Sequence, residues 1–206
     1  MRIALFLLIT TFLYASSYPF FSQKELQTTQ NMRTKNRILD YQNTIAQMQG
    51  LPKQKQLTKT NFYLNQLLPQ YDSVINKEED HWATPKEFLL TGYGDCEDYV
   101  IIKYFTLLKL GFDESKLYIT VVKEKYKGGM HMVLSYFEKK NNSPLILDNL
   151  SFRILKLKKR KDLQVNLLIN STGTYRLQQD RLVKVSSVHQ KYKILMKNIE
   201  NELNNF

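Results

Sequence analysis

The pattern of apolar and polar positions divides the chain into a helical first half and a strand-rich second half. Residues 23–70 carry apolar positions at helical spacing, interrupted at residues 50–52 by Gly-Leu-Pro. A short helix is expected to begin at Pro85, because proline is favoured at the first helical position. Residues 96–110 are apolar on nearly every side, which predicts a helix buried in the core and ended by Gly111.

Beyond residue 113 the apolar positions recur with a period of two, which predicts strands. We expect them at residues 117–123, 131–138, 145–150, 152–158, 163–169 and 175–185. A final amphipathic helix is expected over residues 187–204. Helices, then a meander of antiparallel strands, then a helix predict an α+β fold, in which the buried helix packs on the antiparallel β-sheet.

The first residues have the features of an export signal. Arg2 precedes an apolar run over residues 3–15, and small residues at Ala15 and Ser17 suit cleavage after residue 17. The run is shorter than the roughly 20 apolar residues of a membrane-spanning helix, so no stable membrane insertion is expected after cleavage. We therefore predict a signal peptide at 1–17, with an uncleaved anchor as the alternative, and a single domain at 18–206.

The net charge of +11 comes from 30 Lys and Arg against 19 Asp and Glu, which raises the possibility of an acidic partner. The densest basic cluster lies on a predicted strand and the turn after it, and consists of Arg153, Lys156, Lys158, Lys159, Arg160 and Lys161. Nucleic-acid binding would require interleaved aromatic residues or a known module, and the sequence shows neither. We interpret the cluster as a solvated face, with docking on an acidic protein as the alternative.

The single cysteine, Cys96, can form neither an internal disulfide nor a multi-cysteine zinc site. It lies at the first turn of the buried helix, where the helix dipole and free N–H groups favour a thiolate. His131 begins a predicted strand and Asp148 lies on the next, so a register that places them opposite each other would aim both at the thiol. The other two histidines, His81 and His189, are expected to have surface roles.

Acidic residues flank the thiol at Asp95, Glu97 and Asp98. Like charge beside a thiol opposes its ionisation, so something should offset these carboxylates. Helix capping explains Asp95 and Asp98, but it does not require an acid at position 97. The sharper interpretation is a calcium ion (Ca2+), a hard cation that takes several oxygen ligands.

Four segments resemble the bacterial transglutaminase-like cysteine proteinases, whose best-known members are the periplasmic LapG proteases. They are Trp82-Ala83-Thr84-Pro85, Gly94-Asp95-Cys96-Glu97-Asp98, His131-Met132-Val133-Leu134 and Leu147-Asp148-Asn149. The resemblance covers about residues 60–185 and implies a papain-like, transglutaminase-like α+β fold. It further implies Cys96 as nucleophile, His131 as general base and acid, and Asp148 as the residue that orients His131. Asp95 and Glu97 would ligate calcium, and Asp98 could complete the shell.

The resemblance also implies a function: a calcium-dependent periplasmic endopeptidase that cleaves the N-terminal region of a large surface adhesin and favours biofilm dispersal. A LapD-like inner-membrane receptor for cyclic-di-GMP would control it. Two alternatives stay open. One is a transglutaminase-type acyl transferase that uses the same three residues, and the other is a non-catalytic binding module with a basic docking face.

Overall fold

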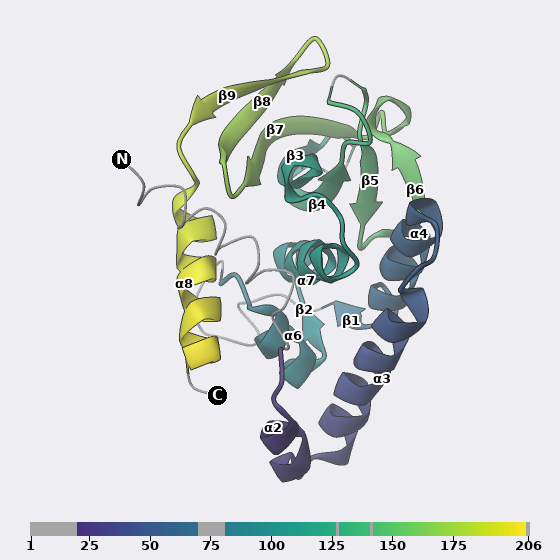
Figure 1. The fold of residues 1–206 in the computed structure, drawn as a ribbon. Coiled ribbons are helices and arrows are strands. Elements are labelled where there is room, and N and C mark those ends of the chain that lie inside the picture. Colours follow the sequence, from purple (N-terminus) through teal and green to yellow (C-terminus); the bar gives the residue numbers. More distant parts are fainter. Residues whose placement is uncertain (1–19, 70–80, 127, 141, 205–206) are drawn as a thin grey trace.

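The computed structural model describes residues 20–69, 81–126, 128–140 and 142–204 (Figure 1). The signal peptide predicted at 1–17 lies outside these residues. The described helices are α2 (Gln23–Thr28), α3 (Met32–Met48), α4 (Lys53–Leu64), α6 (Pro85–Thr91), α7 (Cys96–Lys109) and α8 (Gln190–Asn204). Within the described ranges, no helix combines the length and apolar character needed to cross a bilayer.

The described strands form one large antiparallel sheet and one small parallel pair. The large sheet contains β3 (Leu117–Glu124), β4 (Met130–Tyr136), β5 (Leu145–Asp148), β6 (Ser151–Lys156), β7 (Leu163–Asn170), β8 (Gly173–Gln178) and β9 (Arg181–Ser186). Their order across the sheet is β6-β5-β4-β3-β7-β8-β9. The small pair joins β1 (Leu68–Pro69) to β2 (Tyr93–Gly94), which directly precedes α7.

Helix α7 is the centre of the fold. It packs against β3 and β4 on one side and against α4 and α6 on the others. Figure 1 shows α7 beneath the sheet, with α4 and α3 to one side and α8 to the other. Every residue of α7 from Glu97 to Leu108 is buried. The predicted α+β class, with a buried cysteine-bearing helix on an antiparallel sheet, is confirmed.

Helix α6 begins at Pro85 and α7 ends before Gly111, as expected. Thr84 caps α6, where its side chain and that of Glu87 form a reciprocal capping box ahead of Pro85. Helix α7 ends where Gly111 takes a left-handed conformation, with φ of +80°, and its N–H donates to the carbonyl of Leu108. Residues 84–111, which carry Cys96, therefore begin and end at signals in their own sequence.

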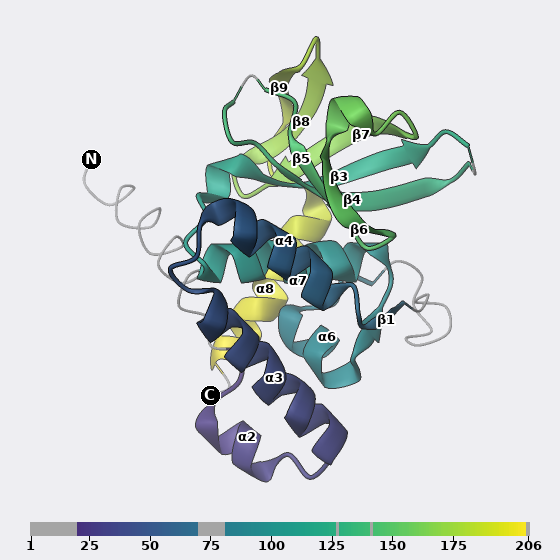
Figure 2. The ribbon, with the colours of Figure 1, turned by 90° about the vertical axis from the view of Figure 1, so that its right-hand side faces the viewer.

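Two predictions about the sheet are wrong. The strands do not form a plain meander, because β7 leaves β6 and returns to pair with β3 in the middle of the sheet. The strand expected over residues 175–185 is instead a hairpin of β8 and β9, whose turn places Gln179 and Asp180 at positive φ. Helix α8 begins at Gln190, three residues later than expected. Figure 2, turned by 90°, shows the β8–β9 hairpin at the top of the molecule, at the opposite end from α2 and α3.

Candidate active site

His131 and Asp148 meet on the face of the sheet that covers α7. His131 Nε2 lies 2.9 Å from Asp148 Oδ1, and both side chains are buried. The register of β4 and β5 pairs Leu134 with Leu147, so Asp148 is not directly opposite His131, and the expected pairing is wrong by two residues. Because side chains alternate with a period of two, a shift of two keeps both residues on one face as diagonal neighbours.

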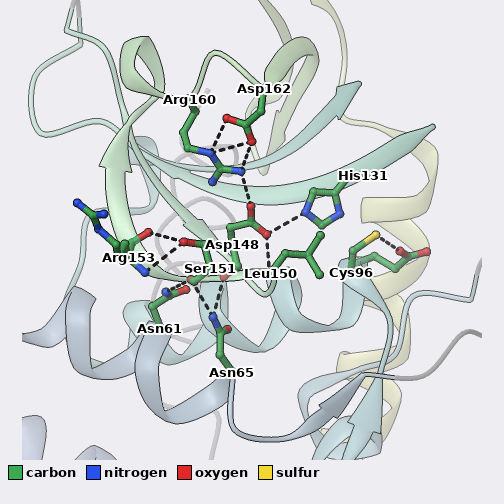
Figure 3. A network of polar contacts seen from close by, with 11 residues as sticks. Asn61, Asn65, Cys96, His131, Asp148, Leu150, Ser151, Arg153, Arg160 and Asp162 are labelled. Atoms are coloured by element: carbon green, nitrogen blue, oxygen red, sulfur yellow. Dashed lines mark hydrogen bonds and ion pairs between the residues drawn. The ribbon is translucent and has the colours of Figure 1, made fainter. Parts of the chain in front are cut away.

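Both oxygens of the Asp148 carboxylate are engaged. Oδ1 accepts from His131 and from the Leu150 backbone N–H at 2.9 Å, while Oδ2 accepts from Arg160 Nη2 at 2.8 Å. Arg160 is held in turn by Asp162, which accepts from its Nε and Nη2 (Figure 3). The orientation of the His131 ring is thus set by a carboxylate that is itself fixed on both sides.

This environment keeps Asp148 ionised. Burial alone would raise the pKa of Asp148, but the hydrogen bond and charge of His131, the Leu150 N–H and Arg160 lower it to about 2. An ionised carboxylate on Nε2 requires a proton on that nitrogen. His131 therefore presents Nδ1 as its second, proton-accepting nitrogen.

Two asparagines of α4 hold the β5–β6 turn that carries Asp148. Asn65 Nδ2 donates to the carbonyl of Asp148 at 2.7 Å and to that of Ser151 at 3.0 Å. Asn61 Nδ2 donates to the same Ser151 carbonyl at 2.8 Å. The helical layer therefore fixes the backbone of the turn, independently of the contacts that the Asp148 side chain makes.

Cys96 lies beside His131, at the start of α7. The backbone N–H of Met132, the residue after His131, hydrogen-bonds to the Cys96 sulfur. In Figure 3 the His131 ring lies between the Asp148 carboxylate and the Cys96 side chain, with its second nitrogen on the Cys96 side. The order of groups is therefore thiol, imidazole and carboxylate.

In this structure the thiol is directed to a carboxylate. Cys96 Sγ donates to Glu97 Oε2 at 3.1 Å. Burial raises the pKa of the Cys96 thiol far above its ordinary value, and the charges of Glu97 and Asp95 add to that effect. A group that neutralises or withdraws these carboxylates would therefore favour the thiolate.

The structure groups Asp95, Cys96 and Glu97, whose potential metal-ligating atoms all lie within 4.8 Å of one another. Burial raises the pKa of Glu97, and the charge of Asp98 contributes in the same direction. Two carboxylates held this close, one of them buried, suit a hard divalent cation by the chemistry of their oxygen donors. The donor set therefore fits calcium.

Asp98 is placed differently from the other two acids. Its Oδ1 accepts from the Ala83 N–H at 2.8 Å and its Oδ2 from the Asp95 N–H at 3.3 Å, and the residue is buried. A Cβ at Gly94 would lie 2.5 Å from Oδ2, so the glycine allows this close approach. Asp98 ties the segment before α6 to the start of α7.

The remaining histidines lie near α6. His81 pairs with Glu87 at 3.3 Å, and the ring of His189 stacks on that of Trp82 with centroids 6.2 Å apart. His189 thus packs against a buried aromatic residue, which differs from the surface role expected for it.

The site contains two further charged residues, Lys103 and Arg160, that the sequence did not single out. Arg160 belongs to the cluster interpreted as a solvated face, yet its guanidinium binds Asp148. Lys103 lies on α7, fully buried, and the charge of Asp148 acts on it. A lone lysine within an apolar helix was the available signal for Lys103, whereas Arg160 could not be distinguished from its neighbours without the fold.

An α+β domain with a thiol at the start of a buried helix, facing histidine and aspartate on a sheet, defines a protein of the transglutaminase-like class. The comparisons agree. A sequence model described as bacterial transglutaminase-like cysteine proteinase (BTLCP) matches residues 20–165. The chain belongs to this family of cysteine proteinases. A search of curated proteins found no match.

Solved structures of Legionella pneumophila LapG are similar to this chain. The calcium-bound form has a TM-score of 0.77 and 35% sequence identity over 86% of this chain and 96% of that one. The EGTA-treated form has a TM-score of 0.77 and 34% identity, over 86% and 95%. A further LapG structure gives 0.75 and 35%, over 86% and 93%. The predicted transglutaminase-like fold is confirmed.

Proposed function

We propose that this protein is a calcium-dependent cysteine endopeptidase in which Cys96 is the nucleophile, His131 the general base and acid, and Asp148 the residue that orients His131. The observation that carries the proposal is the 2.9 Å hydrogen bond between His131 Nε2 and Asp148 Oδ1, on the sheet face against which Cys96 lies. This bond turns the Nδ1 edge of the imidazole toward the thiol.

In the proposed reaction, Nδ1 of His131 removes the thiol proton and Cys96 Sγ attacks the carbonyl carbon of a peptide bond. The Cys96 backbone N–H, in the first turn of α7, is a donor for the developing oxyanion. The imidazolium returns its proton to the leaving amine, which departs and leaves a thioester on Cys96. Water, deprotonated by His131, then hydrolyses the thioester and restores the thiol.

Asp95 and Glu97 are the proposed ligands of calcium, and Asp98, which also holds the loop, would complete the shell. The bound ion would supply positive charge next to the thiol and neutralise the two carboxylates. Glu97 would then no longer accept the hydrogen bond that Cys96 makes to it. The similarity to LapG, for which calcium-bound and EGTA-treated structures are known, supports calcium as the ion.

The proposed substrate is the N-terminal region of a large surface adhesin, whose release favours biofilm dispersal, and the proposed location is the periplasm. The similarity to LapG and the export signal predicted at 1–17 support both. We further propose control by a LapD-like inner-membrane receptor for cyclic-di-GMP that sequesters the protease. The receptor's periplasmic part, added to the purified enzyme, should then slow cleavage.

The test is incubation of the purified protein with the N-terminal part of a candidate adhesin from the same genome, in calcium and in excess chelator. We expect cleavage in calcium alone and none with Cys96→Ala. Cleavage that survives Cys96→Ala would remove the peptidase proposal, and cleavage unchanged in chelator would remove the calcium dependence. A labelled amine in the same reaction distinguishes hydrolysis from acyl transfer, because only a transferase attaches the amine to the cleaved acyl group.

A further inference from the structure

Arg160 differs from the other residues of the basic cluster. Lys156, Lys158, Lys159 and Lys161 are exposed, whereas the Arg160 side chain is only 12% exposed. Turning a long cationic side chain away from water is costly unless charged partners compensate. The burial of Arg160 therefore indicates a role that the exposed lysines beside it do not have.

The partners of Arg160 form a continuous chain that ends at His131. Arg160 Nε lies 3.0 Å and 3.1 Å from the two Asp162 oxygens, and Nη2 lies 2.7 Å from Asp162 Oδ2 and 2.8 Å from Asp148 Oδ2. Asp148 Oδ1 then binds His131. Since both Asp148 oxygens are occupied by donors on opposite sides, the carboxylate cannot rotate without losing one of them (Figure 3).

The backbone around Arg160 is held as firmly as its side chain. The Arg160 N–H donates to the carbonyl of Leu157 at 2.8 Å, closing the short helix at Leu157–Lys159. The carbonyl of Asp162 accepts from the Lys125 N–H at 2.8 Å, which ties the turn to the chain that leaves β3. The backbone of Arg160 is therefore fixed in position, so the guanidinium is held where it can bind Asp148.

We propose that Arg160, held by Asp162, is a positioning residue that fixes the Asp148 carboxylate and offsets its charge for the reaction at Cys96. The inference rests on the proposed function, since Asp148 is there the residue that orients His131. With Arg160 in place, Asp148 keeps its acceptor geometry but carries less uncompensated charge. The imidazole is then oriented by a carboxylate that Arg160 keeps from rotating.

The charged groups facing Asp148 come from three elements. His131 comes from β4, Arg160 from the turn after β6, and Lys103 from α7, while Asp162 faces Asp148 through Arg160. Removing the arginine charge leaves the carboxylate to act more strongly on the imidazolium, which then loses its proton at higher pH. A residue that served only to attach the turn would produce no such shift.

The first test compares Arg160→Gln with Arg160→Lys, and uses Lys159→Gln as a matched control that removes one positive charge from the exposed neighbour. We expect Arg160→Gln to lower kcat with little change in KM, by about the 10- to 100-fold that is typical when the outer-shell partner orienting a metal-ligating residue is removed. Arg160→Lys should recover part of the loss, and Lys159→Gln should match the wild type. Asp162→Asn, which loosens Arg160 without removing it, should give an intermediate loss.

The second test follows the imidazole of His131 by NMR as a function of pH in the Cys96→Ala protein, which requires no cleavage. We expect Arg160→Gln to move the titration of His131 to higher pH, because a positive charge near the imidazolium is lost, and Lys159→Gln to leave it in place. If the wild type fails to cleave but the titration moves, the proposed function fails and the positioning role stands. An unshifted titration, or a kcat loss matched by Lys159→Gln, would overturn the role of Arg160.

Discussion

Replacement of Lys103 by methionine should stabilise the fold and change how its stability depends on pH. Lys103 is fully buried on α7, and no hydrogen-bond partner of its Nζ lies among the described residues. Lys103 Nζ lies over the Tyr99 ring, 5.8 Å from the ring centroid. Burial lowers the pKa of Lys103 to about 7, against the opposing effect of the Asp148 charge.

The sign and size follow from proton linkage. Lysine has a pKa of about 10.4 in the unfolded chain, so between about pH 7 and that value the unfolded state binds one more proton. The free energy of unfolding should therefore rise with pH across this window, by about 1.4 kcal/mol per unit and ~5 kcal/mol in total. Below pH 7 both states are protonated and the cost of burying the charge is fully present.

Lys103→Met removes this cost while keeping an unbranched side chain of similar length. We expect the variant to be more stable than the wild type at pH 6.5 by roughly 2–5 kcal/mol, with a smaller gain at pH 9.5. Urea denaturation in chelator, followed by the fluorescence of Trp82, the single tryptophan, measures both quantities. Lys197→Met on the exposed face of α8 is the control and should leave the slope with pH unchanged.

The reasoning about Lys103 would be refuted by a variant whose stability changes with pH as steeply as that of the wild type. It would equally be refuted by a variant less stable than the wild type at pH 6.5.

Four further predictions concern the site. Asp148→Asn should lower kcat/KM about 10²- to 10⁴-fold in the cleavage assay, because His131 loses its charged orienting partner. Glu97→Gln should speed alkylation of the thiol in chelator, since a neighbouring charge is removed, and abolish any further increase by calcium. Asn65→Ala should lower the free energy of unfolding by ~1–2 kcal/mol, because two backbone carbonyls of the β5–β6 turn lose a donor. Gly94→Ala should cost ~1–3 kcal/mol in thermal or urea denaturation, because the new Cβ displaces a buried carboxylate. Wild-type values in any of these measurements would contradict the corresponding contact.

The sequence could predict the helical layer and the identity of the facing residues, because both depend on local signals. The proline at position 85, the apolar residues of α7 and the glycine at position 111 act within a few residues of themselves. His131 and Asp148 were placed on one face correctly although the register was wrong by two, since strand alternation preserves the face under such a shift.

What the sequence could not provide depends on contacts distant along the chain. The return of β7 to pair with β3 follows from how the sheet packs as a whole, whereas neighbouring strands in sequence are the usual expectation. Arg160 is one of several basic residues in its cluster, and only the turn after β6 directs it inward. The pairing of Asn65 with the Asp148 carbonyl likewise joins residues 83 positions apart.

The most direct measurement of whether His131 activates Cys96 is the alkylation rate of the thiol. Because Cys96 is the single cysteine, iodoacetamide labelling followed by mass spectrometry reports this site alone. At neutral pH with calcium present, labelling of the wild type should be at least about 10-fold faster than that of His131→Ala, because the imidazole stabilises the thiolate. Equal rates in the two proteins would contradict the assignment of Cys96 and His131 as nucleophile and base.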